Sequence, residues 1–102
     1  MSLSNFIQNT DKKFTVKIYV DGVQSVLTGA DALKFYLLNA KCDDDSDAVI
    51  ESDGVIAAGV ADFHITAAEL DIDAGQYFWK LKYTDASGEV SKPDSSSITV
   101  EC

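Results

Sequence analysis

The sequence predicts an all-β fold, an immunoglobulin-like antiparallel β-sandwich of about seven short strands. Apolar and polar residues alternate with a period of two, turn signals separate the runs, and no apolar pattern lasts long enough at helical spacing for a full helix. A length of 102 residues is enough for one domain and too little for two. We therefore expect a single domain over residues 1–102, with an N-terminal arm at 1–13 and the sandwich at 14–102.

The first half of the sandwich begins with the strand expected at residues 14–20. Its apolar side chains fall on one face: Phe14, Val16, Ile18 and Val20. Asp21-Gly22 predicts a tight turn, and residues 23–27 a short return strand. Residues 32–38 are apolar on both faces, which indicates a central strand.

The second half resumes alternation at residues 59–65, and Thr66 with Glu69 fits a capping box around a single helical turn. The clearest strand covers residues 76–83, which place one face of large side chains together: Tyr77, Trp79, Leu81 and Tyr83. The last expected features are a turn at 85–88, a return strand at 89–92, a serine-rich linker at 93–97 and a closing strand at 98–100.

Asp73, Gly75 and Tyr77 match the Asp-x-Gly-x-Tyr pattern of a tyrosine corner, in which the tyrosine hydroxyl bonds back to the preceding loop. In immunoglobulin domains a cysteine follows two residues later. Here Trp79 takes that place, and we expect its ring to fill the space between the sheets. A disulfide between Cys42 and Cys102 stays open beside the simpler alternative of two free thiols.

The charge balance excludes several classes of partner. Seventeen acidic residues face eight basic residues, all of them lysine, for a net charge of -9. Nucleic-acid readers need a basic stripe, and anionic membranes repel acidic chains, so we expect neither partner. The apolar stretches are far shorter than the roughly 20 residues that span a bilayer, and the N-terminus has no pattern of an export signal.

Candidate catalytic residues are few. His64 is the only histidine and falls on the polar side of its strand. The serines at 95–97 lack a Gly-x-Ser-x-Gly elbow, and the glycines form no phosphate-binding pattern. We therefore predict that the protein is not an enzyme and uses no cofactor.

The acidic loop at 43–47 is the one metal candidate. Aspartates occupy the first, third and fifth positions of a calcium loop: Asp43, Asp45 and Asp47. The sixth position is Ala48 instead of glycine and the twelfth is Gly54 instead of glutamate, so the EF-hand interpretation fails. A looser calcium site with Asp71 and Asp73 stays open beside a solvated acidic loop.

Aromatic residues suggest two kinds of contact. A sugar-binding platform would use four of them: Trp79, Tyr83, Tyr77 and Tyr19. Three of the four share one strand face with Leu81, as core residues do, so the core interpretation is favoured. Phe78, on the opposite face, is either covered by a neighbouring segment or part of a contact with another chain. We expect Phe6 and Ile7, in the apolar segment 3–7, to dock on a neighbouring chain.

The order of these segments resembles the N-terminal domain of phage baseplate upper proteins and related tail-associated immunoglobulin-like modules. The segments that carry the resemblance are residues 14–18, 27–30 leading into 33–37, 59–66, 73–79, 83–88 and 98–100. It implies a non-catalytic structural role in a phage or prophage tail, as a homo-oligomer or docked on neighbouring virion proteins, with assembly in the bacterial cytoplasm. The alternative is a surface or secreted immunoglobulin-like module for adhesion or carbohydrate binding.

Overall fold

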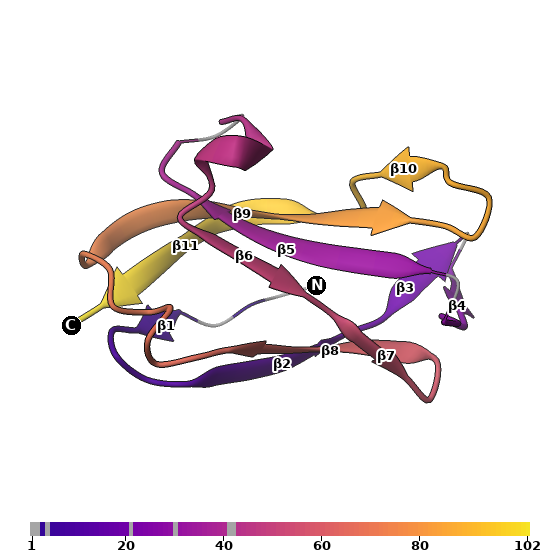
Figure 1. The fold of residues 1–102 in the computed structure, drawn as a ribbon, viewed down its shortest axis with the longest axis horizontal. Helices are drawn as coiled ribbons and strands as arrows, with labels where there is room; N and C mark the ends of the chain where they lie inside the picture. Colours follow the sequence, from indigo (N-terminus) through magenta and orange to yellow (C-terminus); the bar gives the residue numbers. More distant parts are fainter. Residues whose placement is uncertain (1–2, 4, 21, 30, 41–42) are drawn as a thin grey trace.

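A computed structural model of the chain describes residues 3, 5–20, 22–29, 31–40 and 43–102. In these ranges the secondary structure consists of eleven strands and one 3₁₀ turn, η1 (Asp45–Asp47), with no α-helix. The all-β prediction is confirmed. The strands form two layers (Figure 1).

The larger sheet contains six strands. Its order is β1 (Phe6–Ile7), β11 (Ser95–Glu101), β9 (Gly75–Thr84), β5 (Ala32–Leu38) and β6 (Ile50–Asp53), and β10 (Val90–Ser91) also pairs with β9. β1 runs parallel to β11, and the other pairs are antiparallel. The prediction of a central strand at residues 32–38 is confirmed, because β5 bonds to β9 on one side and to β6 on the other.

The smaller sheet contains three antiparallel strands, and a separate hairpin contains two. The sheet is β2 (Lys12–Val16), β8 (Val60–Ile65) and β7 (Val55–Ala57), and the hairpin is β3 (Ile18–Val20) with β4 (Val23–Ser25). The run expected as one strand at 14–20 is therefore interrupted at Lys17. Its first part joins the smaller sheet and its second part forms the hairpin. Asp21 lies outside the described residues.

β6 leads into β7 through Gly54, so the chain passes there from the larger to the smaller sheet. The amide of Gly54 donates to the carbonyl of Leu33 at 2.8 Å. A Cβ at this position would lie 2.9 Å from Cζ of Phe63 and 3.1 Å from Cβ of Ala61, so the crossing needs glycine for lack of space. Interruptions such as this one, and the one at Lys17, divide the chain into more and shorter strands than the expected seven.

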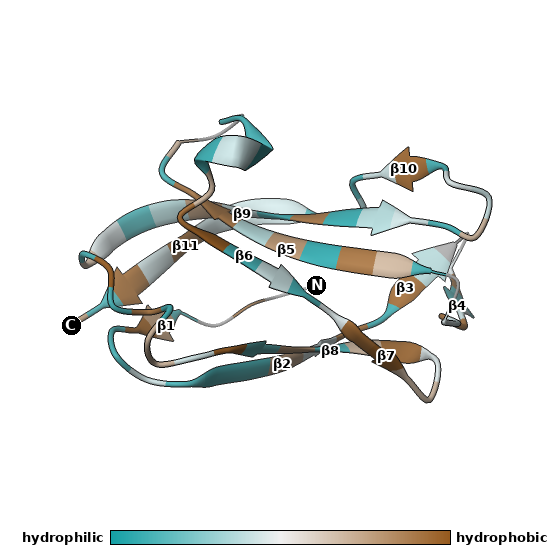
Figure 2. Ribbon diagram, in the orientation of Figure 1, coloured by the Kyte–Doolittle hydropathy of each residue, from teal (hydrophilic) through white to brown (hydrophobic). Residues whose placement is uncertain are grey.

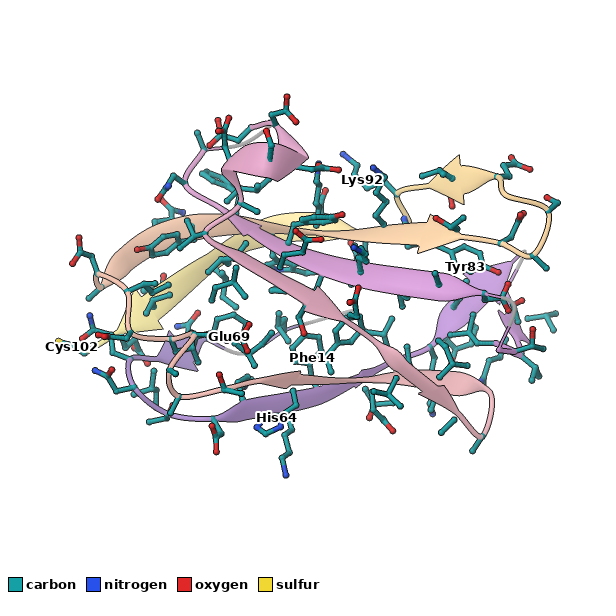
Figure 3. All side chains as sticks on the ribbon, in the orientation of Figure 1. Phe14, His64, Glu69, Tyr83, Lys92 and Cys102 are labelled. Carbon is teal, nitrogen blue, oxygen red and sulfur yellow. The ribbon has the colours of Figure 1, made fainter. Side chains whose placement is uncertain are left out.

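An aromatic core joins the two layers, and Figure 3 shows Phe14 between them. Phe14 of β2 stacks on Phe63 of β8 with ring centroids 5.1 Å apart, and meets Phe35 of β5 edge-on at 5.3 Å. Phe35 in turn stacks on Trp79 of β9 at 6.1 Å. Trp79 is only 2% exposed, so its ring fills the core as expected.

The predicted N-terminal arm is wrong for the described residues from Phe6 onward. Phe6–Ile7 form β1 beside the last strand, Gln8 donates its amide to the carbonyl of Glu101 at 2.8 Å, and Lys12 begins β2. Phe6 is fully buried, with its ring centroid 6.0 Å from that of Phe35. The prediction of Phe6 as an interface residue is therefore wrong, because its side chain already packs in the core of its own chain.

The predicted serine-rich linker is also wrong. Ser95 to Ser97 belong to β11 and pair with Lys80 to Phe78 of β9. Backbone hydrogen bonds hold a strand whatever its side chains are, and Ser95 to Ser97 are exposed to solvent. Hydrophobic periodicity therefore does not mark the beginning of β11.

Three local predictions are confirmed. Thr66 and Glu69 exchange the two hydrogen bonds of a capping box, Thr66 N to Glu69 Oε1 at 3.0 Å and Glu69 N to Thr66 Oγ1 at 3.2 Å, around a single turn. Gly88, with φ of +91°, closes the turn that begins at Asp85. β10 then provides the expected short return strand.

Candidate functional site

An ionic cluster lies where the acidic loop crosses the outer face of the larger sheet. Asp45 of η1 accepts hydrogen bonds from Nζ of Lys80 and, at 2.9 Å, from Nζ of Lys82. Both lysines point away from the core because alternate residues of β9 share one face. Nζ of Lys80 also lies 5.5 Å from the ring centroid of Tyr36. The acidic loop is thus tied to the sheet by one carboxylate held between two ammonium groups.

This cluster shifts the ionisation of its members. Hydrogen bonds from Lys80 and then Lys82 hold the pKa of Asp45 below its ordinary value of 3.8. The hydrogen bond to Asp45 raises the pKa of Lys82 above 10.5. A second pair lies nearby on the same face, where Lys34 bonds to Glu51 at 2.8 Å and this bond raises the pKa of Lys34.

The cluster bears on the calcium hypothesis. Within the described part of the chain, no three His, Cys, Asp or Glu side chains gather in a way that could hold a metal ion. Asp43, Asp45 and Asp47 are therefore not brought together with Asp71 and Asp73 as a calcium site. Asp45 binds lysines instead, and a metal ion would have to compete with both of them.

Two adjoining hollows flank the ionic cluster on the outer face of the larger sheet. The first, of about 460 Å³, has Phe78 in its lining together with the serines at 95–97. The second, of about 260 Å³, extends to Asp45, Lys82 and Val90. Lys80 and Lys92 line both. We call this joint depression the lysine hollow, and it places Phe78, one of the predicted interface residues, half-buried in its lining.

A third hollow, of about 570 Å³, lies on the smaller sheet beside His64. His64 is exposed, as expected, and Figure 3 shows it on the outside of this sheet. Its charged neighbour is Asp11, at 3.7 Å from Nε2 to Oδ1. Asp11 also accepts the amide of Ala67 at 2.7 Å. The side chains of His64 and Asp11 are both exposed, and no hydrogen bond joins His64 to a hydroxyl or thiol of the described residues.

The tyrosine corner is confirmed. Oη of Tyr77 donates to the carbonyl oxygen of Asp73 at 2.6 Å. Gly75, between them, has φ of +151°, a backbone conformation that favours glycine. With Trp79 in the core, the four residues of this segment have structural roles.

The sugar platform is wrong. Tyr77 and Trp79 are buried, and Tyr83 is half-buried, because their strand face covers the core. Oη of Tyr83 donates to Asp31 at 3.1 Å, and burial above all raises the pKa of this tyrosine. The amide of Thr28 is the main cause that lowers the pKa of Asp31. Of the four aromatic residues, Tyr19 alone is exposed, and a single ring makes no platform.

Exposed apolar side chains lie on both faces of the β3–β4 hairpin and just after it, and sequence reasoning missed them. Tyr19 pairs with Gln24 and Val23 pairs with Val20, so the side chains of Tyr19 and Val23 lie on opposite faces of the hairpin. Tyr19 is 60% exposed, Val23 70% and Val26 69%, and we call these three residues the hairpin patch. The amide of Leu27 donates to the carbonyl of Gly59 at 3.0 Å, which ties the hairpin to the β7–β8 turn. Figure 2 shows the apolar colouring of β7 at this end of the molecule. Periodicity alone assigned these residues to strands without indicating that their side chains stay uncovered.

The remaining interface candidate, Ile7, is half exposed at the edge strand β1. Cys102 is exposed, whereas Cys42 lies outside the described residues, so the alternatives of a disulfide and of two free thiols both stay untested. No helix in the described ranges is long and apolar enough to cross a membrane.

Compared with known proteins, the chain matches no protein-family model and no curated protein.

Proposed function

We propose that this chain is a non-catalytic structural module that works through contacts with other protein chains, and that the hairpin patch is its contact surface. The observation that carries the proposal is the exposure of Tyr19 and Val23 on the two faces of one hairpin and of Val26 just after it, so that a partner would have to cover the hairpin from both sides. The centres of protein interfaces are apolar, contain few charges and favour tyrosine. The segments around Val23 and Val26 have this character, since residues 22–29 and 54–61 contain no charged residue, whereas Lys17 and Asp21 flank Tyr19 in the sequence.

The partner that fits this patch best is a second copy of the chain. A two-fold symmetric contact brings the same surface of each copy together, so that surface must be complementary to itself. The uncharged segment at residues 22–29 satisfies this condition without bringing like charges together. The rest of a surface with a net charge of -9 disfavours self-contact by repulsion. The charge distribution therefore directs self-association to the hairpin end.

The resemblance to phage baseplate upper proteins extends this proposal to an assembly of the phage-tail or prophage type, formed in the bacterial cytoplasm, with a variant of the immunoglobulin-like sandwich as its building block. The tyrosine corner at Tyr77 and the turn closed by Gly88 support the fold assignment. The genes beside the native gene test the setting: tail and tape-measure genes would support it. An upstream segment encoding a signal peptide would refute it in favour of a secreted adhesion module.

Sedimentation velocity from micromolar to millimolar concentration tests the contact. We expect the unaltered chain to self-associate and the double variant Tyr19→Ser, Val23→Ser to sediment as a monomer. Val90→Ser is the matched control, because Val90 is 53% exposed on β10, outside the patch. It should associate as the unaltered chain does. A chain that stays monomeric over the whole range, or a loss of association in the control as large as in the double variant, would refute the proposed contact.

A further inference from the structure

Positive charge gathers at the lysine hollow. Three of its eight lysines line the hollow: Lys80, Lys82 and Lys92. Two aspartates, Asp43 and Asp45, share the lining, so positive charge locally exceeds negative in a chain of net charge -9. At physiological salt, charges separated by more than about 8 Å are largely screened, so this local excess determines what the hollow attracts.

The hollow already holds one carboxylate. Lys80 and Lys82 stand two residues apart on β9 and together bind the carboxylate of Asp45. Their spacing therefore suits a carboxylate. Lys92 lines the same hollow and forms no ion pair with the described residues, and Figure 3 shows it on the outer face of the larger sheet. Among the described residues, no carboxylate competes with an incoming anion for this ammonium group.

The rest of the lining favours an extended peptide over a compact anion. The chain contains no arginine and therefore offers a compact anion no bidentate fork, only the point charges of its lysines. The hollow instead extends along β9 from Phe78 to Lys82 beside β10 and β11. Its lining contains serine hydroxyls and the side chains of Phe78 and Val90 as well as the lysines. Such a lining offers charged, polar and apolar contacts to the successive residues of an extended peptide.

We propose that the lysine hollow binds an extended acidic segment of a partner protein, with Lys92 and Lys80 holding its carboxylates and Asp45 acting as an internal competitor for Lys80. Charge complementarity selects this occupant. The contact is separate from the hairpin patch and does not depend on it, because the two surfaces share no residue.

Fluorescence anisotropy with a labelled oligoglutamate peptide at physiological salt, where the distant negative charges are screened, tests this site. Lys92→Gln should weaken binding by about two- to five-fold, the worth of one exposed ion pair. Lys17→Gln, the matched control on an exposed lysine outside the hollow, should leave it nearly unchanged. Asp45→Asn should tighten binding because it removes the internal competitor, whereas Asp71→Asn, the same charge change at an exposed site outside the hollow, should not.

Three results would overturn the proposal. The first is the absence of binding, measured as no change in anisotropy, with both the unaltered chain and Asp45→Asn. The second is an equal loss for Lys92→Gln and Lys17→Gln, which would show general electrostatic attraction only. The third is displacement of the peptide by glucuronate or inorganic phosphate at an equal concentration of anionic groups, which would assign the hollow to small anions. None of these results affects the sedimentation test of the hairpin patch, so the two proposals fail separately.

Discussion

Replacing Gly54 by alanine should destabilise the fold through steric overlap alone. The added Cβ would lie 2.9 Å from Cζ of Phe63, well inside the roughly 3.5–4.0 Å of an ordinary carbon contact. Phe63 is 2% exposed and stacked on Phe14, so its ring has little room to move away. Overpacking of this kind costs about 1–3 kcal/mol. For a domain of this size the melting temperature should fall by roughly 5 to 20 °C.

Thermal and urea denaturation measure the effect, with Gly29→Ala as the control. No atom lies within 4 Å of a Cβ built on Gly29, so its change to alanine should be neutral or slightly stabilising. In a Phe63→Leu background, the shorter side chain should lower the cost of Gly54→Ala, and a double-mutant cycle reports that coupling. Equal stability of Gly54→Ala and the unaltered chain, or an equal cost in both backgrounds, would refute the steric argument.

The remaining predictions concern a hydrogen bond, the acidic residues and the N-terminal strand. Tyr77→Phe removes the bond to the carbonyl of Asp73 and should lower the free energy of unfolding by about 0.5–1.5 kcal/mol, measured in urea; an unchanged midpoint would contradict it. Lysine ammonium groups lower the pKa of Asp45, and the Thr28 amide lowers the pKa of Asp31. These two carboxylates therefore stabilise the fold at pH values above the ordinary pKa of 3.8. Their contribution to the free energy of unfolding is lost as the pH falls through the lowered pKa values. The melting temperature should therefore fall when the pH is lowered under about 4, and it should fall less in Asp45→Asn than in the unaltered chain. An equal fall in both would count against a stabilising role of the Asp45 carboxylate. Phe6→Ala should cost about 3–5 kcal/mol in urea denaturation because this side chain is fully buried, whereas an exposed arm residue would cost almost nothing.

Features set by neighbouring residues could be predicted from the sequence. Alternation along residues 76–83 separates the core face of β9 from its lysine face because side chains of a strand point alternately to its two sides. The capping box at Thr66 and the tyrosine corner at Tyr77 were also predictable, since each hydrogen bond joins residues three or four positions apart.

Features set by distant pairing could not be predicted in the same way. Phe6 pairs with Val100 at the other end of the chain, and nothing in a two-residue strand indicates its partner. The serines of β11 are held by the backbone of β9, so their polarity wrongly suggested a linker. The exposure of Val23 and the position of Lys92 depend on which strands lie beside them, and alternation carries no such information.

The parallel pairing of β1 with β11 determines how the molecule responds to a pulling force. In a parallel pair, the N-terminal side of β1 and the C-terminal side of β11 point in opposite directions. Tension applied through Phe6 and Glu101 therefore shears this pair along its length and loads its hydrogen bonds together, including the bond from Gln8 to Glu101. An antiparallel terminal pair, pulled from adjacent ends, would instead open one bond at a time. The burial of the Phe6 ring adds core packing to this resistance, so the link between the first and last strands acts as a short mechanical clamp.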